Sequence, residues 1–128
     1  MEPIYSRGDC SRQLTRRQRG EQMEKLACRY LRQAGLRWIS SNILYRQGEL
    51  DLIMLDEQTY VFVEVRYRKN DLYGDAVATI TWRKQQKIKT AAAYWLANHN
   101  MCLSTANCRF DVVAVTGSRV NWIKNAFY

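Results

Sequence analysis

The sequence predicts a single mixed α/β domain, with helices packed against a sheet in the order α-β-β-β-α-β-β. Its 128 residues are a usual length for one domain. Two segments repeat apolar residues with the 3.6-residue period of a helix, and the segments around them change to the two-residue period of strands. With 47% hydrophobic residues, the chain can bury a core without disulfides or structural metals.

The composition argues against a membrane or secreted protein. No apolar stretch approaches the roughly 18 residues that a membrane-spanning helix needs, and residues 1–20 carry five arginines where a signal peptide would be apolar. The cysteines form no CxxC pair, and His99 is the only histidine that could join them in a zinc site. We therefore expect reduced cysteines and a cytoplasmic protein. The cysteines are Cys10, Cys28, Cys102 and Cys108.

The N-terminal part divides into a basic arm, residues 1–16, and the start of a single folded domain, residues 17–128. The arm lacks apolar periodicity, so we expect it to be flexible. A helix follows, because apolar residues recur at helical spacing and Gly35 supplies a natural stop. The apolar face of this helix comprises Met23, Leu26, Ala27, Tyr30, Leu31 and Ala34.

Three strands are predicted next. Residues 36–45 form the first, and Gly48 restarts the chain after it. Apolar residues then alternate in two further strands, on either side of a turn at residues 56–59. The alternating sets are Leu50, Leu52 and Met54 in one strand, and Val61, Val63 and Val65 in the next.

A loop from Lys69 to about Ile80 leads to a second helix, with Thr81 as its expected N-cap and Asn98 near its end. Two final strands near residues 109–116 and 120–124 are joined by a turn at residues 117–118. The apolar face of the second helix comprises Ile88, Ala91, Ala92, Trp95 and Leu96.

The central hairpin brings acidic residues together. A two- or four-residue turn centred between Glu57 and Gln58 places Asp51 opposite Glu64. Like charges directly opposed across two strands destabilise the pair, so these carboxylates require a counter-charge. The same register places Glu49 opposite Arg66, which supplies part of that charge. Carboxylate oxygens with room for water and phosphate suit Mg²⁺, or Mn²⁺, so the pattern favours a metal site for phosphodiester hydrolysis.

Two other interpretations of the hairpin stay open. A three- or five-residue turn would shift the register and place Asp51 and Glu64 on opposite faces. Glu49 and Arg66 could equally form an ordinary surface ion pair that contributes less than about 1 kcal/mol.

The start of the second helix is strongly basic. Cations in the first turn oppose the helix dipole, and a bound phosphate would offset that cost. A solvated face that keeps the protein soluble is an equally good explanation. The basic residues are Arg83, Lys84, Lys87 and Lys89.

Residues 48–53 (GELDLI) and 61–68 (VFVEVRYR) resemble the GExDLI…FVEVKxR signature of the YraN-like bacterial proteins. The resemblance covers about residues 17–127 and includes further matches at Glu24–Ala27, Tyr30-Leu31, Tyr73-Gly74, Lys84, Ala91–Leu96 and Arg109–Val113. This family is related to the PD-(D/E)xK nucleases, which include restriction enzymes and Holliday junction resolvases. The kinship implies a restriction-endonuclease-like core, a mixed sheet flanked by helices with a divalent metal at the hairpin.

By this resemblance Asp51 and Glu64 bind the metal, and Glu24 is similar to the helix glutamate that completes the site in resolvase-like members. Arg66 takes the place of a lysine, whereas Glu49 matches the family's own motif. Arginine stays charged and can clamp phosphate, but it hardly serves as a base. The residues expected to bind nucleic acid are Arg66, Arg68, Lys69, Arg83, Lys84 and Lys87.

The first functional hypothesis is thus a metal-dependent nuclease, with DNA favoured over RNA and branched or structured DNA as a candidate substrate. An alternative is a nucleic-acid-binding protein with a degenerate catalytic site, and another is an adaptor that binds a protein. A homodimer is an option, because resolvase-like relatives act as dimers.

Overall fold

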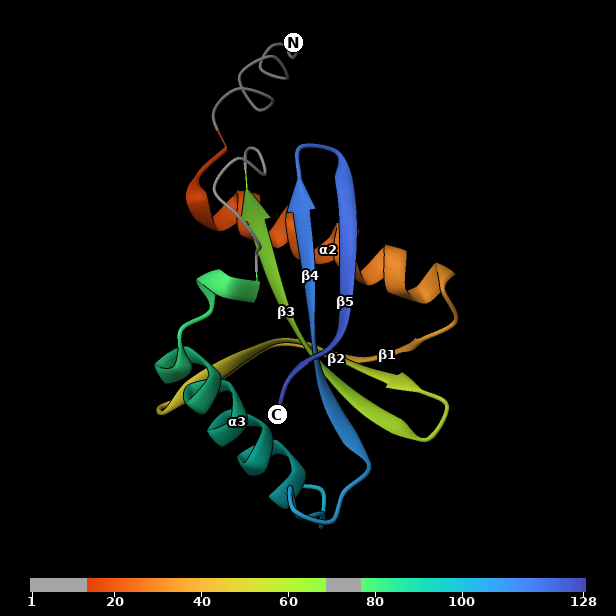
Figure 1. Cartoon of the computed structure of the whole chain (residues 1–128), viewed down its shortest axis with the longest axis vertical. Coiled ribbons are helices and arrows are strands. Elements are labelled where there is room, and N and C mark those ends of the chain that lie inside the picture. The colour runs from red at the N-terminus through yellow and green to blue at the C-terminus, as the bar shows by residue number, and fades with distance from the viewer. Residues whose placement is uncertain (1–13, 69–76) are drawn as a thin grey trace, which may run out of the picture.

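The computed structural model describes residues 14–68 and 77–128, which form one five-stranded sheet with two α-helices (Figure 1). The elements follow the predicted order α-β-β-β-α-β-β, with a short 3-10 helix, η1, before the second α-helix. Their bounds are α2 Arg16–Gln33, β1 Arg37–Tyr45, β2 Gly48–Asp56, β3 Thr59–Arg68, η1 Val77–Thr79, α3 Trp82–Ala97, β4 Cys108–Thr116 and β5 Arg119–Phe127.

The sheet is mixed, with its strands in sequence order from β1 to β5. Antiparallel pairing joins β1 to β2 and β2 to β3, and it joins β4 to β5. The central strands β3 and β4 pair in parallel, which requires the crossover through α3. The expected mixed α/β architecture is therefore confirmed.

Each of the two α-helices is capped by the threonine that precedes it. Thr15 forms a capping box with Gln18 at the start of α2, and the Thr81 hydroxyl accepts a hydrogen bond from the Lys84 backbone N–H at the start of α3. The α2 helix stops before Gly35, whose φ of +105° ends the helical path. Of the predicted arm, Arg16 is already helical and residues 1–13 lie outside the described part of the chain.

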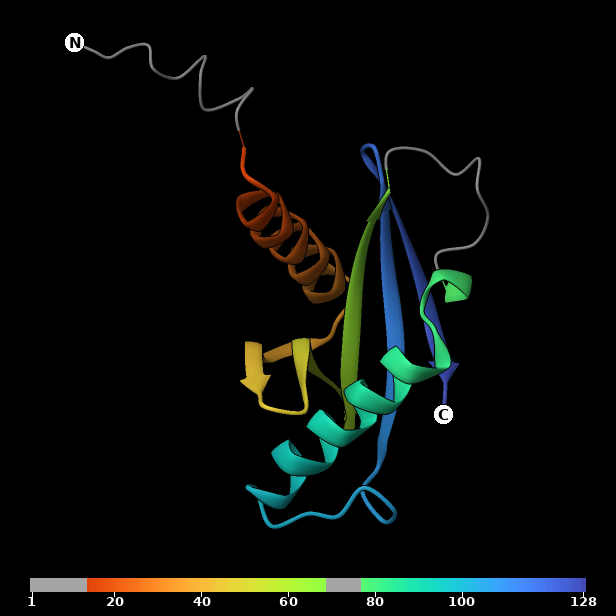
Figure 2. The same ribbon diagram turned by 90° about the vertical axis from the view of Figure 1, so that its left-hand side faces the viewer.

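Two apolar layers form the core, one on each face of the sheet. The α3 layer contains the predicted apolar face of that helix and an aromatic row in which Phe62, Phe110 and Phe127 stack at centroid distances of 5.5 and 5.2 Å. The α2 layer packs Ala27 and Leu31 against valines of β3 and β4. Figure 2 shows α2 to one side of strands β3 to β5, which are seen edge-on.

A buried carboxylate ties the last strand to the sheet. Asp111 on β4 has no solvent exposure, and it accepts hydrogen bonds from the Arg109 Nε, Trp122 Nε1 and Asn125 backbone N–H groups at 3.0, 2.9 and 2.9 Å. These bonds span the irregular pairing between β4 and β5. The ion pair with Arg109 compensates the buried charge of Asp111, and the same guanidinium also pairs with Asp56 at 3.0 Å, so these charges stabilise the fold.

The β2–β3 hairpin has a two-residue turn, one of the two lengths that the predicted register allows, and it keeps that register from Asp56 opposite Thr59 to Leu52 opposite Val63. The pairing ends there, before the predicted pair of Asp51 and Glu64. The predicted alternation in β2 is wrong at one position. Leu50 packs in the α3 layer, whereas Leu52 packs in the α2 layer, so β2 changes face at Asp51. The strand can do so because its recorded pairing with β3 ends at Leu52, and Figure 1 shows the two strands diverging from their shared turn.

Candidate functional site

The divergence of β2 and β3 makes a fork, and Asp51 lies in it. The Val65 backbone N–H of β3 donates a hydrogen bond to Asp51 Oδ2 at 2.9 Å. A side chain of β2 thus satisfies the β3 backbone beyond the last strand pair. This fixes one carboxylate oxygen of Asp51 between the two strands.

Glu64 lies on β3 next to Asp51, and only 6% of its side chain is exposed. Two cations flank it. Its Oε2 lies 3.5 Å from Arg66 Nε and 4.0 Å from Lys84 Nζ, so β3 and α3 each contribute one cation. Arg66 pairs here with Glu64 and does not reach the predicted position opposite Glu49, because the strand pairing stops before that point.

Asp51 and Glu64 are too close for both to ionise easily. Burial, followed by the charge of Asp51, raises the pKa of Glu64 to about 8, although Lys84 and Arg66 act to lower it. Burial also raises the pKa of Asp51, against the hydrogen bond from Val65. A hydrogen bond joins the two side chains, which is compatible with a proton on one carboxyl of the pair but not with strong repulsion between two carboxylates.

Glu24 of α2 faces the same pair. Burial and the charge of Asp51 raise its pKa to about 7, while a hydrogen bond from the Asn42 side chain lowers it. Among the residues that the structure describes, its buried Oε1 has no hydrogen-bond partner. Glu24 thus interacts with Asp51, and Glu49 is close enough to raise the pKa of both Asp51 and Glu24. We call these four carboxylates, Glu24, Glu49, Asp51 and Glu64, the acidic cluster.

The acidic cluster has the donors for a divalent cation but is not arranged as a finished metal centre. Within residues 14–68 and 77–128, no three His, Cys, Asp or Glu side chains form a group that could hold a metal ion as they are placed. Glu24 has a buried oxygen without a hydrogen-bond partner in the described part of the chain, and the pKa values of Glu24, Asp51 and Glu64 are all raised. Hard oxygen ligands of this kind fit Mg²⁺ or Mn²⁺.

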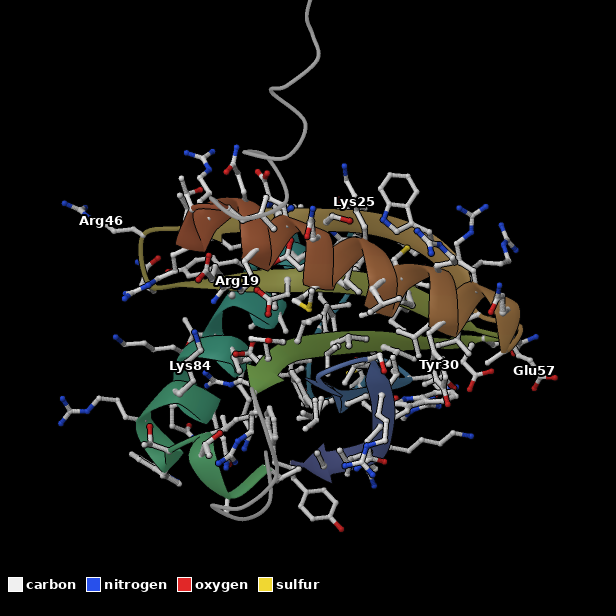
Figure 3. All side chains as sticks on the ribbon, turned by 90° about the horizontal axis from the view of Figure 1, so that it is seen from above. Arg19, Lys25, Tyr30, Arg46, Glu57 and Lys84 are labelled. Atoms are coloured by element: carbon white, nitrogen blue, oxygen red, sulfur yellow. The ribbon has the colours of Figure 1, made fainter. Side chains whose placement is uncertain are left out.

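A basic groove opens next to the acidic cluster. It lies between the β1–β2 turn and α3, has a volume of about 500 Å³, and is lined by Arg46, Glu49, Lys84 and Lys87 among others. Figure 3 shows Arg46 and Lys84 extending on the same side of the molecule. The turn approaches α3 so closely that a Cβ on Gly48 would lie 2.5 Å from the Lys87 carbonyl oxygen.

The other predicted nucleic-acid contacts are not all gathered here. Arg83 is exposed on the first turn of α3, and none of the ion pairs recorded for the described residues joins it to the carboxylates. Arg68 is the last residue of β3, and Lys69 lies outside the described residues. Lys84 and Lys87 are therefore the predicted helix cations that the fold brings to the site.

Sequence reasoning missed Asn42 and Arg46. Asn42 lies in β1 between positions that pair with Leu50 and Leu52, hence across from Asp51, and has a φ of +53°. The only signal was the polar run from Ser40 to Asn42 inside a predicted strand. Arg46 reaches the groove because the β1–β2 turn folds against α3, which no local pattern reveals.

Cys28, Cys102 and Cys108 are free thiols, as expected, while Cys10 lies outside the described residues. Of the helices described, none is both long and apolar enough to cross a membrane.

Comparison with known proteins identifies the family. The model of the uncharacterised protein family UPF0102 matches residues 23–115, from α2 to β4. The chain belongs to the UPF0102 family. UPF0102 proteins YraN of Salmonella agona (strain SL483) and Salmonella newport (strain SL254) are each 52% identical to it over 127 residues, covering 99% of this chain and 97% of each relative.

The UPF0102 match confirms the resemblance seen in the GELDLI and VFVEVRYR segments. It contains Glu24, Asp51, Glu64, Arg66 and Lys84, so the whole acidic cluster lies in the family's shared region. The family's description names no activity, and function must be argued from the geometry of these residues.

Proposed function

We propose that this UPF0102 protein is a metal-dependent nuclease that hydrolyses phosphodiester bonds of DNA, and that its core is related to that of the PD-(D/E)xK enzymes. The observation that carries the proposal is the Asp51–Glu64 pair at the strand fork, in which Glu64 is buried and Asp51 half-buried, flanked by Arg66 and Lys84. Buried acids with raised pKa values and adjacent cations are typical of sites that handle phosphate.

Asp51 and Glu64 would hold the divalent cation, with Glu24 reaching the site from α2. When bound, the cation polarises a phosphoryl oxygen and lowers the pKa of water. The chain's own part is to keep the carboxylates apart from bulk water and to place positive charge beside them. Burial keeps the Glu64 carboxyl out of bulk water, and the hydrogen bond from the Val65 N–H orients the Asp51 carboxyl.

Arg66 and Lys84 have different tasks in this proposal. Arg66 binds a phosphate oxygen with the fixed set of donors on its guanidinium group. Lys84 carries an amine 4.0 Å from Glu64, and an amine can release a proton more readily than a guanidinium. Lys84 thus supplies from α3 the amine that position 66 lacks.

Replacement of the fork carboxylate tests the proposal. Purified wild type and Asp51→Asn are incubated with labelled duplex, single-stranded and four-way DNA, and with RNA, in Mg²⁺ or Mn²⁺. We expect metal-dependent cleavage by the wild type and a loss of at least about a hundredfold in Asp51→Asn. The matched control is Glu57→Gln, an exposed acid on the β2–β3 turn that lies far from Lys84 (Figure 3). Equal cleavage by Asp51→Asn would refute the site.

The arginine at position 66 favours a second candidate, a nucleic-acid-binding protein that does not cleave. Under this alternative, the wild type does not cleave DNA, and Lys84→Met only weakens its binding to DNA. Under the nuclease proposal, Lys84→Met reduces the cleavage rate far more than it reduces affinity, whereas Arg66→Lys keeps part of the activity. Cleavage and binding measured on the same DNA separate the two.

A further inference from the structure

A second cavity lies next to the acidic cluster, between α2 and β1. Its volume is about 500 Å³, which is within the roughly 300–1,000 Å³ range of small-ligand sites. Its lining combines an aromatic ring, two cations, two carboxylates, an amide and a hydroxyl with a thiol and an apolar side chain. Those used below are Glu24, Lys25, Arg32, Trp38, Ser41 and Asn42.

The indole of Trp38 is presented to solvent and held in place. Half of the residue is exposed, and its Nε1 donates a hydrogen bond to Ser41 Oγ at 2.8 Å. Residues three apart in a regular strand point to opposite faces. A shift in the β1–β2 register between Trp38 and Ser40 brings them to the same side. A large exposed aromatic ring is thus fixed by a strand irregularity beside an acidic site.

Cations lie on the opposite wall of the cavity. Lys25 and Arg32 are seven residues apart on α2, which places them on one side of the helix. Figure 3 shows Lys25 extending on the side of α2 away from Lys84. The cavity is therefore distinct from the basic groove at α3.

Glu24 connects the cavity to the acidic cluster. It lines the cavity, its side chain is hydrogen-bonded by Asn42, and its charge interacts with that of Asp51. A ligand in this cavity would consequently lie beside the carboxylates at the strand fork.

We propose that this cavity binds one unpaired nucleotide of a nucleic acid strand, with its base stacked on Trp38 and its phosphate near Lys25 and Arg32. The inference rests on the proposed nuclease function and names the kind of substrate. Base faces inside a duplex are covered by their neighbours, so only an unpaired or displaced nucleotide can stack on a protein ring. Strands with unpaired ends, flaps or branch points present such a nucleotide.

Tryptophan fluorescence of the full chain tests the proposal without any need for cleavage. Single-stranded oligothymidylate is titrated into the protein in a chelating buffer, with a duplex of equal length as comparison. We expect quenching by the single strand, and a loss of quenching together with about tenfold weaker binding in Trp38→Leu. Trp38→Phe should restore much of the affinity, because a ring remains. Circular dichroism verifies that each variant is folded.

A charge-matched pair of variants tests the cations. Lys25→Gln should weaken single-strand binding, whereas Lys124→Gln, on the exposed part of β5 over the Trp122 ring, should have a much smaller effect. Unchanged single-strand affinity in folded Trp38→Leu would overturn the cavity proposal, even if Asp51→Asn abolishes cleavage. Trp38-dependent binding by a protein that cleaves nothing would support the cavity and refute the nuclease.

Discussion

The surroundings of Glu64 favour its neutral form in some respects and its charged form in others. In the protein without metal, its burial and the neighbouring Asp51 favour the neutral form. Arg66 and Lys84 favour the charged form, and a bound divalent cation would add strongly to their effect. The residue is therefore poised to exchange a proton for a cation.

The raised pKa of Glu64 predicts how stability depends on pH. The unfolded carboxyl titrates near its ordinary 4.5 and the folded one at about 8, so between these values the folded state binds more protons. The free energy of unfolding must then fall as pH rises through this window, by at most about 1.4 kcal/mol per pH unit for one group. Urea unfolding in chelating buffer measures this slope.

Glu64→Gln is the control for that slope, because glutamine does not titrate. We expect the variant to show a shallower decline between about pH 5 and about pH 8, and the raised pKa values of Glu24 and Asp51 to account for the part that remains. Mg²⁺ should stabilise the wild type more at the higher pH, since its ligands must be deprotonated. Wild-type stability that is flat or rising over this window, relative to Glu64→Gln, would contradict the assignment.

The residues of the site differ in how far the sequence alone could predict them. The predicted register of the hairpin singled out Asp51 and Glu64, because it depends only on the length of the turn. The strand pairing ends one residue before Asp51, so the two residues meet through their side chains and not as a strand pair. Glu24 followed only from the family resemblance, because nothing local to α2 indicates where its side chain meets the sheet. Asn42 and Trp38 were not identified, since their positions depend on backbone irregularities in β1 that alternation does not predict.

At the scale of elements, the close approach of the β1–β2 turn to α3 organises the groove. Gly48 permits it, because any side chain there would meet the Lys87 backbone. The contact fixes the turn that carries Arg46 relative to the helix that carries Lys84. An irregular, close-packed contact of this kind sets the width of the groove.

A pair of glycine substitutions tests this contact. Gly48→Ala places a Cβ 2.5 Å from a backbone oxygen, so we expect it to lower the free energy of unfolding by about 1–3 kcal/mol. Gly20→Ala is the matched control: it lies inside α2, its Cβ meets nothing within 4 Å, and it should raise stability by up to about 1 kcal/mol. Urea denaturation measures both. Equal, small effects would show that the turn can move away from α3 at little cost.

Elements were predictable where one local rule governs them. The predicted N-cap Thr81 and the predicted apolar face of α3 agree with the structure, because capping and helical periodicity are short-range. The alternation predicted for β2 failed at Leu50, because the strand leaves its partner at Asp51 and turns its next residue to the other face. Strand alternation in β2 therefore fails at the position where the carboxylates of Asp51 and Glu64 come together.

At the scale of the whole molecule, a net charge of +8 surrounds a locally acidic site. Such a charge attracts polyanions within about one Debye length, roughly 8 Å at physiological ionic strength, without selecting a sequence. The acidic cluster would repel the same polymer unless a cation were bound. Affinity and positioning are therefore expected to arise from different residues.

Salt dependence of DNA binding tests this division. The logarithm of the binding constant should fall linearly with the logarithm of salt concentration, because contacts to phosphate release counterions. Lys87→Gln, in the groove, should reduce the magnitude of the slope by about one. Lys124→Gln removes the same charge from β5 and should leave the slope nearly unchanged. Identical slopes for all three proteins would place the DNA elsewhere.

The hydrogen bonds to Asp111 have a practical consequence for anyone who handles the protein. Two of its three donors come from Trp122 and Asn125, within the last seven residues of the chain. Removal of the last four residues would delete the Asn125 N–H that donates to the buried Asp111 carboxylate, and it would also delete Phe127 from the stacked aromatic row. An affinity tag can follow Tyr128, but a shortened expression clone that ends before Asn125 should yield insoluble protein.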